Sequence, residues 1–181
     1  MSIAPNDILD HQIGPMVRTV ELRTISFFHD ELDLVPAKIE RRLHHKDQFV
    51  LREITAIVGV GSSEGLYIAF SYSQSLAHAM MKRYTRELLI APDEEALYVR
   101  ETASDVVNVI VGNCTADLTK RGEMMTLSPP VLALGARTIQ GRPQTAVAVL
   151  GLHFPEGMLD IAFVGPKLLF DEHLNYMGEN T

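Results

Sequence analysis

The sequence has one cysteine, no tryptophan and no long run of apolar residues. A membrane-spanning helix needs about 20 consecutive apolar residues, so we expect no membrane span. A single cysteine excludes a disulfide within the chain. Cys114 falls among apolar residues at helical spacing, which favours a buried structural thiol over a redox or catalytic one. The first residues lack the basic and apolar segments of a secretory signal, so a cytoplasmic location is expected.

Positive charge is also scarce, with 16 Lys and Arg against 23 Asp and Glu and a formal net charge of −7. Binding of nucleic acid needs a clustered basic face, so no nucleic-acid partner is expected. The basic run 38–46 is short and contains Glu40, which predicts a solvated loop or a strand at a sheet edge. His44 and His45 are adjacent and have no further ligands at suitable spacing, so the sequence predicts no metal site.

Two common catalytic motifs are missing as well. No Gly-rich loop ends in Lys-Ser or Lys-Thr, as a phosphate-binding loop does, and no serine lies in a nucleophile elbow. The length of 181 residues and the apolar fraction of 46% are ordinary for a globular domain. We therefore expect one domain spanning residues 1–181, whose function depends on some other pattern.

Three polar residues at helical spacing form the most informative pattern in the sequence. Glu101, Asp105 and Asn108 fall within about 60° of arc on an α-helix, and Gly112 follows one turn later on the same face. These four residues are called the polar stripe below. The residues on nearly the opposite side are apolar: Val106, Val107, Ile110, Val111, Cys114 and Leu118. The pattern predicts an amphipathic helix with the polar stripe facing outward.

Asn108 and Gly112 weaken a purely structural interpretation of the polar stripe. Exposed Glu and Asp usually mark no more than a solvated helix surface. Asn, however, competes for backbone hydrogen bonds inside a helix, and an interior Gly costs about 1 kcal/mol relative to Ala. A residue without a side chain at Gly112 would let another backbone approach closely. A functional surface is therefore the main hypothesis, and a solvated face is the alternative.

Periodicity and turn residues predict the elements around the polar stripe. Helices are expected at 6–30, with a kink or break at Pro15, and at 74–87, with Ser73 as its cap. A third helix is expected to be capped by Asp93, to run to about Lys120 and to be ended by Gly122. Strands are expected at 49–61, 66–71, 131–136, 145–154 and 158–164, with a turn at 62–65. Residues 166–176 are predicted to form a closing helix. The core would then span residues 49–165.

Two segments of the chain resemble each other. Residues 64–70 and 156–163 match with one residue inserted, and each follows a strand that begins with Thr-Ala, at Thr55-Ala56 and Thr145-Ala146. Two related hairpins would form one antiparallel sheet about a pseudo-twofold axis, covered by long helices. The fold class predicted is therefore α+β in two layers, although hairpins share turn chemistry and a chance match is the alternative.

The polar stripe and the proline pair Pro129-Pro130 resemble the motif of the CheX and CheC family of chemotaxis phosphatases. The family pattern is an acidic residue or Ser, three residues, Glu, two residues, Asn, then about twenty residues and a Pro pair. Residues 58–71 also resemble the family's first hairpin, and the helix with Ala79-Met80-Met81 its next element. The resemblance covers roughly residues 50–165. A single motif is more similar to the CheX branch, which implies a homodimer formed by edge-to-edge pairing of sheets.

The resemblance implies hydrolysis of the aspartyl phosphate on a phosphorylated receiver domain of the CheY type. Asn108 would hold the attacking water, Asp105 would pair with the receiver's active-site lysine, and Glu101 would support the contact. Gly112, Pro129 and Pro130 would border the partner. No cofactor is implied for this chain, because the magnesium ion belongs to the receiver.

Asp105 departs from the family pattern, which has Glu at this position. Its side chain is shorter by one methylene, about 1.5 Å of reach, and a misplacement of about 1 Å can cost on the order of a hundredfold in rate. A second hypothesis is therefore a weak or inactive relative that binds a receiver or signalling protein as an adaptor. A third is a structural oligomer in which the polar stripe is only solvated surface.

Overall fold

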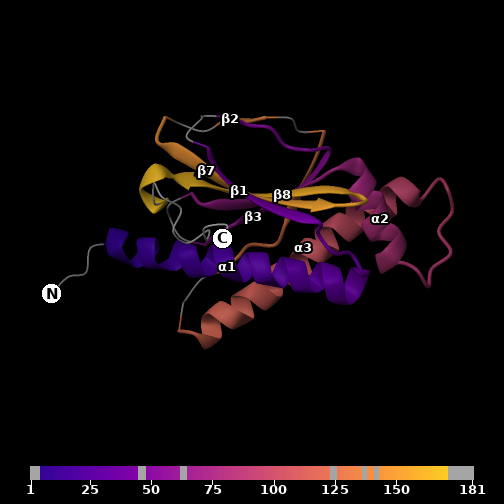
Figure 1. The fold of residues 1–181 in the computed structure, drawn as a ribbon, viewed down its shortest axis with the longest axis horizontal. Coiled ribbons are helices and arrows are strands. Elements are labelled where there is room, and N and C mark those ends of the chain that lie inside the picture. The colour runs from indigo at the N-terminus through magenta and orange to yellow at the C-terminus, as the bar shows by residue number, and fades with distance from the viewer. Residues whose placement is uncertain are drawn as a thin grey trace.

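Figure 1 shows the computed structural model, which describes residues 5–44, 48–61, 65–122, 126–135, 138–140 and 143–170. The helices lie on one side of a sheet, and strand β2 lies on the other side (Figure 1). In chain order the elements are α1 (Pro5–Leu32), β1 (Lys38–His44), β2 (Gln48–Phe49), β3 (Ile54–Gly59), β4 (Tyr67–Tyr72), α2 (Gln74–Tyr84), α3 (Glu95–Lys120), β5 (Val131–Leu134), β6 (Ile139–Gln140), β7 (Thr145–Phe154), β8 (Gly157–Pro166) and a 3-10 turn (Lys167–Leu169).

The main sheet has six strands in the order β1-β7-β8-β4-β3-β5, and every neighbouring pair is antiparallel. The hairpins β3–β4 and β7–β8 meet through β4 and β8. Ala69 lies opposite Ala162 at this junction, and Ile68 lies opposite Phe163. Because each alanine faces its counterpart in the repeated segment, a pseudo-twofold axis passes between the two strands. The α+β fold class and the sheet of two related hairpins are thus confirmed.

The earlier part of the predicted repeat has the wrong register. Ala56 lies opposite Phe70, whereas Ala148 lies opposite Phe163. The structural counterpart of Ala56 is therefore Ala148, whereas the sequence match pairs it with Ala146. The two alignments differ by two residues, so both leave the same side chains facing the core. In the described residues β8 is followed by a 3-10 turn where β4 is followed by α2.

Alternation along the strands places one face of the sheet against the helices. Buried residues such as Ile68, Phe70 and Phe163 form the main core with residues of α1, α2 and α3. The opposite face has a smaller cluster, in which Phe49 and Leu51 cover part of the sheet. Near this cluster the buried Asp160, only 4% exposed, pairs with Arg42 and Arg52. The sheet thus has a helical side that supports α3 and a second side closed by a short β2–β6 pair.

Several boundaries differ from the sequence predictions. Helix α1 runs without a break through Pro15. The buried residues Ile13, Met16 and Val17 hold both sides of the proline against the core, and this packing offsets the missing hydrogen bond. The basic run forms edge strand β1 where the sequence left a choice between loop and strand. Strand β3 begins only at Ile54, because Phe49 belongs to β2.

The helix ends show which caps were predicted correctly. Ser73 Oγ accepts a hydrogen bond from the backbone N–H of Leu76 and caps α2, which ends at Tyr84 and not near residue 87. Asp93 does not cap α3: the capping position is Glu94, and its side chain makes no capping bond. Gly122 adopts a φ of 80° just after α3, which confirms it as the terminator. Residues 62–64 of the predicted turn and 171–176 of the predicted closing helix lie outside the described residues.

Candidate functional site

Helix α3 presents the polar stripe to solvent. Its apolar face is buried as predicted, with Val99, Thr102, Ala103, Val106, Val107, Ile110, Val111, Cys114 and Leu118 turned inward. Glu101, Asp105, Asn108 and Gly112 are all exposed. The spacing that buries one face therefore sets the other outward. An interpretation of Asn108 as a core residue is excluded.

The polar groups of the stripe are free. Within the described part of the chain, the side chains of Glu101, Asp105 and Asn108 make no hydrogen bond or ion pair. Their neighbour Arg100 differs, because its Nε donates to the backbone oxygen of Ala96 at 3.0 Å. The two carboxylates and the amide of the stripe thus keep their full hydrogen-bonding capacity for a partner.

Both ends of α3 are tied to neighbouring elements, which gives the polar stripe a firm base. Helix α3 packs on both α1 and α2: its first turns share a pocket with Gln74 and His78 of α2, and α1 contacts it near its C-terminal end. Arg23 of α1 forms a two-pronged pair with Asp117 of α3, with Nε–Oδ2 at 2.5 Å and Nη2–Oδ1 at 2.7 Å. This hydrogen bonding holds the pKa of Asp117 below its usual value. Side chains on such a helix keep fixed positions relative to one another.

Gly112 leaves open space at the end of the polar stripe. A Cβ built at this position would meet no atom within 4 Å outside its own helix neighbourhood. The glycine is therefore not needed for packing against the rest of this chain. An exposed interior Gly that costs helix stability without a packing reason favours close approach from outside.

The proline pair lies at the start of edge strand β5. Ser128 fixes the segment, because its N–H donates to Gly59 O at 2.8 Å and its Oγ accepts from Gly59 N–H at 2.8 Å. Pro129 is exposed and Pro130 is half-buried. Strand β5 packs against α3, so the prolines lead into the strand that borders the stripe-bearing helix. The structure places them on a rigid segment but gives them no bonded contact with the stripe.

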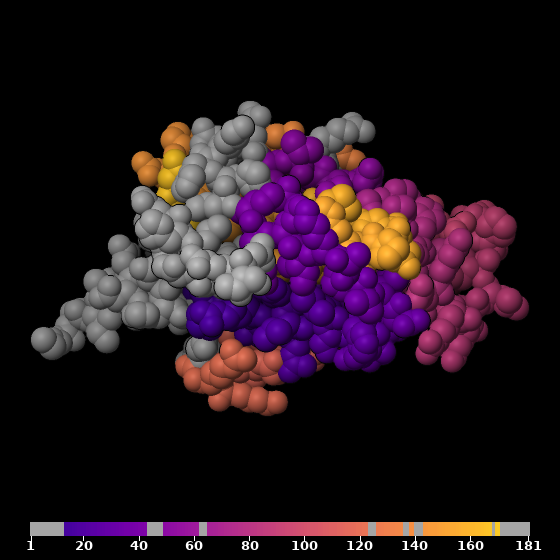
Figure 2. All heavy atoms as spheres, in the orientation of Figure 1, coloured from indigo at the N-terminus to yellow at the C-terminus, as the bar shows by residue number. Residues whose placement is uncertain are grey.

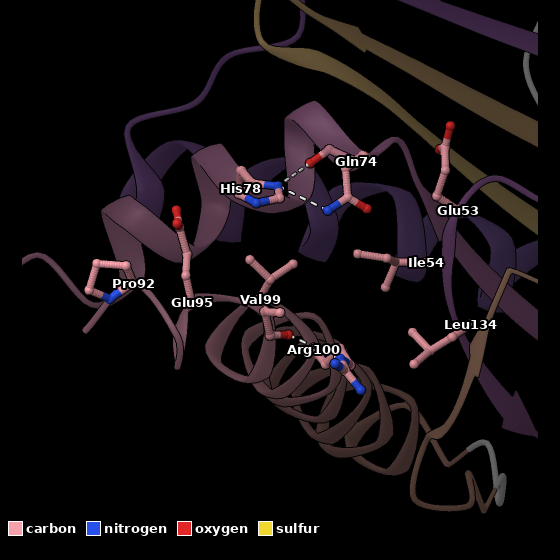
Figure 3. Close-up of a pocket in the computed structure, with 10 residues that line it drawn as sticks. Glu53, Ile54, Gln74, His78, Pro92, Glu95, Val99, Arg100 and Leu134 are labelled. Atoms are coloured by element: carbon pink, nitrogen blue, oxygen red, sulfur yellow. Dashed lines mark hydrogen bonds between the residues drawn. The ribbon is translucent and has the colours of Figure 1, made fainter. Parts of the chain in front are cut away.

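A pocket of about 460 Å³ lies beside the first turns of α3 (Figure 3). Ile54, Val99 and Leu134 converge on its centre, from β3, α3 and β5 respectively (Figure 3). His78 closes another side, and its Nδ1 is bonded to the backbone oxygen of Gln74 at 2.9 Å. The pocket has an apolar floor and a polar rim, and none of the four stripe residues lines it.

One exposed residue on the face of α3 that carries the polar stripe was not predicted from the sequence. Leu97 precedes Glu101 by four residues, so it extends the same face by one turn, and it is 50% exposed. The same spacing that identified Glu101 and Asp105 was enough to find it. It was missed because an apolar residue does not stand out near the start of an amphipathic helix.

Two other kinds of chemistry find no support in the described residues. Cys114 is fully buried, and burial raises the pKa of its thiol to about 12, so it is an unreactive core residue as predicted. No group of three or more His, Cys, Asp or Glu side chains in the described ranges is placed to hold a metal ion.

Across those ranges, no helix has the length and apolarity that crossing a membrane requires.

At the sequence level the chain matches no protein-family model and no curated protein. In three dimensions it is similar to the chemotaxis protein CheX from Desulfovibrio desulfuricans, with a TM-score of 0.67 and 15% identity over 82% of this chain and 97% of that chain. For a CheC-like superfamily protein from Shewanella sp. PV-4 the TM-score is 0.65 at 16% identity, covering 83% and 96%.

A chain of the CheX–CheY–BeF3–Mg²⁺ complex from Borrelia burgdorferi gives a TM-score of 0.56 at 18% identity, covering 82% and 96%. These comparisons establish that the chain has the fold of CheX and CheC-like chemotaxis proteins. The resemblance inferred from the polar stripe and the first hairpin is thus confirmed for the fold.

Proposed function

We propose that this protein is a phosphatase that hydrolyses the aspartyl phosphate of a phosphorylated CheY-type receiver domain, in chemotaxis or related two-component signalling. The observation that carries the proposal is the exposed, unpartnered pair Asp105 and Asn108 on a well-anchored helix of a CheX-like fold. The choice of partner is supported by the structural neighbour from Borrelia burgdorferi, which is a CheX in complex with CheY.

Asn108 holds the attacking water in the proposed reaction. Its carboxamide accepts a hydrogen bond from the water and fixes it in line with the phosphorus. The water oxygen attacks phosphorus, the bond from phosphorus to the receiver's aspartate oxygen breaks, and the products are inorganic phosphate and a free aspartate carboxylate. An uncharged amide suits this task because phosphoryl transfer depends mainly on positioning and charge stabilisation.

The carboxylates of the polar stripe orient the receiver. Asp105 pairs with the receiver's active-site lysine, and Glu101 supports the contact one turn earlier on the helix. Gly112, Pro129 and Pro130 border the partner, and the open space at Gly112 lets the backbone of the partner come close to α3. The magnesium ion belongs to the receiver, so this chain binds no cofactor of its own.

An adaptor is the second candidate, and the observation that favours it is Asp105. The shorter side chain reaches about 1.5 Å less far than Glu, which is enough to weaken a positioned contact severely. An adaptor of this kind binds the receiver on the same face of α3 but turns over little phosphate.

We also propose that the protein acts in the cytoplasm as a homodimer, paired through an open edge of the main sheet. Within the described residues the sheet ends at β1 and β5. Strand β1 has charged residues such as Lys38 and Arg42, which disfavour edge pairing, whereas Val131 at the start of β5 is 68% exposed. Light scattering of a Val131→Lys variant tests this, and an unchanged dimer would exclude the β5 edge.

The lifetime of the phosphoryl group on a CheY-type receiver, with and without this protein, tests the proposed function. A shorter lifetime that returns to normal with Asn108→Ala supports the phosphatase. An unchanged lifetime accompanied by binding of the receiver supports the adaptor. Absence of both effects across the available CheY-type receivers leaves the polar stripe as solvated surface and contradicts both functions.

A further inference from the structure

Val109 completes a four-residue surface around Asp105 on α3. An α-helix turns by about 100° per residue, so Asn108 lies about 60° to one side of Asp105 and Val109 about 40° to the other, one turn later. Gly112 follows a further turn along, between these two. Asp105, Asn108, Val109 and Gly112 are all exposed and are called the docking surface below. Figure 2 shows the later part of α3, in salmon, projecting past α1 at the lower edge of the molecule.

Val109 has no role in the core of this chain. Its side chain is 39% exposed, and within the described residues it belongs neither to the buried core nor to the partly buried apolar residues that pack against it. An exposed helix position favours residues such as Ala, Glu or Lys, whereas valine loses rotamer freedom in a helix. Asn108, Val109 and Gly112 thus all weaken α3 at one place, without a packing reason in the described part of the chain.

We propose that Val109 is a positioning residue for the receiver and acts through Asp105. This inference rests on the proposed function and deepens it. In the proposed complex Asp105 pairs with the receiver's active-site lysine, and Val109 forms an apolar wall on the side of Asp105 away from Asn108. The wall excludes solvent from the ion pair, while the opposite side stays polar for the water that Asn108 holds.

Helix geometry directs Val109 toward Asp105. Residues four apart on a helix are neighbours, with Cβ atoms about 5 to 6 Å apart. Side chains also lean toward the helix N-terminus, so Val109 lies over the turn that holds Asp105. The branched side chain of valine occupies mainly one rotamer in a helix, which fixes both methyl groups. A partner that enters the open space at Gly112 therefore meets Val109 and Asp105 together.

The electrostatics of an ion pair explain why an apolar neighbour matters. The attraction between two charges is about fourfold stronger at the effective dielectric constant near a protein surface than in bulk water. Salt also screens a shielded pair less than an exposed one. The carboxylate of Asp105 has no partner within the described residues, so the strength of its pair with lysine depends on the surroundings in the complex. Val109 therefore strengthens this pair and makes it less sensitive to salt.

The test uses the full chain and a CheY-type receiver loaded with beryllofluoride and Mg²⁺, chosen as the tightest binder of the wild-type chain. Val109→Thr keeps the shape of the side chain but adds a hydroxyl group that holds water, whereas Val109→Ile keeps the apolar wall. Val50→Thr is the matched control, at a 68% exposed valine between β2 and β3. Kd is measured for each chain at about 50 and 300 mM salt.

We expect Val109→Thr to raise Kd relative to wild type by about threefold at low salt and about tenfold at high salt. Val109→Ile and Val50→Thr should follow wild type at both salt concentrations. In an Asp105→Asn background, Val109→Thr should change Kd by less than about twofold, because no ion pair is left to shield. This double-mutant comparison separates an effect through Asp105 from a simple packing contact.

Equal Kd values for wild type and Val109→Thr at both salt concentrations would overturn the role of Val109 and leave the proposed function intact. The same loss with and without the Asp105 carboxylate would also overturn it, because Val109 would then contact the partner independently. Failure of the wild-type chain to bind any loaded receiver would contradict the proposed function and this inference together. Unchanged thermal unfolding of each variant confirms that the fold is retained, as expected for exposed positions.

Discussion

Asp105 and Asn108 lie three residues apart on the exposed face of α3, and neither side chain bonds to any described part of the chain. The same helix buries its opposite face and is joined to α1 through Arg23 and Asp117. A site that positions a water molecule against another protein requires free polar side chains on a rigid element. Asp105 and Asn108 on α3 meet this requirement.

Lengthening Asp105 should strengthen the proposed activity. Asp105→Glu restores about 1.5 Å of reach, and a correction of that size can raise the rate by up to about a hundredfold. Single-turnover dephosphorylation of the receiver measures the change. A rate that stays the same or falls would mean that this protein approaches its partner differently and that Asp105 is already the suitable length.

Gly112 offers a variant in which stability and activity should change in opposite directions. Gly112→Ala places a methyl group in open space, so we expect the free energy of unfolding to rise by about 0.5 to 1 kcal/mol. The same methyl group blocks close approach, so receiver binding should weaken. Urea unfolding and a binding titration give the two readouts. Full binding by the stabilised variant would remove the proposed role of Gly112.

The ion pair of Arg23 and Asp117 should make the stability of the fold depend on pH in the acid range. Hydrogen bonding from Arg23 lowers the pKa of Asp117 in the folded state relative to the unfolded chain. Its contribution is therefore present above the unfolded pKa of about 3.9 and is lost as the pH falls through the lower folded value. Wild type should be more stable than Asp117→Asn at pH 7, and this difference should shrink below about pH 4. A difference in urea midpoint that is constant from pH 3 to 7 would argue against the clamp.

Replacing Asp160, on the outer face of the sheet, should lower the stability of the fold more than replacing an exposed carboxylate. It accepts hydrogen bonds from Arg52 Nε at 2.7 Å and from Arg42 Nη2 at 3.0 Å. Asp160→Ala leaves two half-buried guanidinium groups without this partner, which we expect to cost about 2 to 3 kcal/mol of stability. Asp93→Ala, which removes an exposed carboxylate, is the control. Equal unfolding midpoints for the two variants would show that the Asp160 pairs contribute no net stability.

The buried face of α3 and the bounds of β7 could be predicted from the sequence, because each depends on the pattern of apolar residues within its own segment. The buried face of α3 follows from its period of 3.6 residues, and β7 was predicted with its observed bounds because Thr145 to Phe154 is an apolar run. The similarity of the two segments predicted one sheet of two related hairpins, and the structure places Ala69 opposite Ala162 where the hairpins meet. The exposure of the polar stripe also follows from spacing within α3. The same spacing indicates the exposed Leu97, which was not predicted.

Features set by distant contacts could not be predicted from local patterns. Helix α1 continues through Pro15 because buried neighbours such as Met16 pack against the core. The equivalence of Ala56 with Ala148 depends on strand register, which a repeat with an inserted residue does not fix. The link between Arg23 and Asp117 joins positions 94 residues apart, and no sequence spacing indicates it.

The most direct test of the central claim compares Asn108→Ala with Asn113→Ala in single-turnover dephosphorylation of a CheY-type receiver. Both are exposed asparagines on α3, but Asn113 lies off the polar stripe. The proposed mechanism predicts that wild type and Asn113→Ala shorten the lifetime of the phosphoryl group equally, and that Asn108→Ala loses about a hundredfold or more of the added rate. Equal rates for the two variants would contradict it.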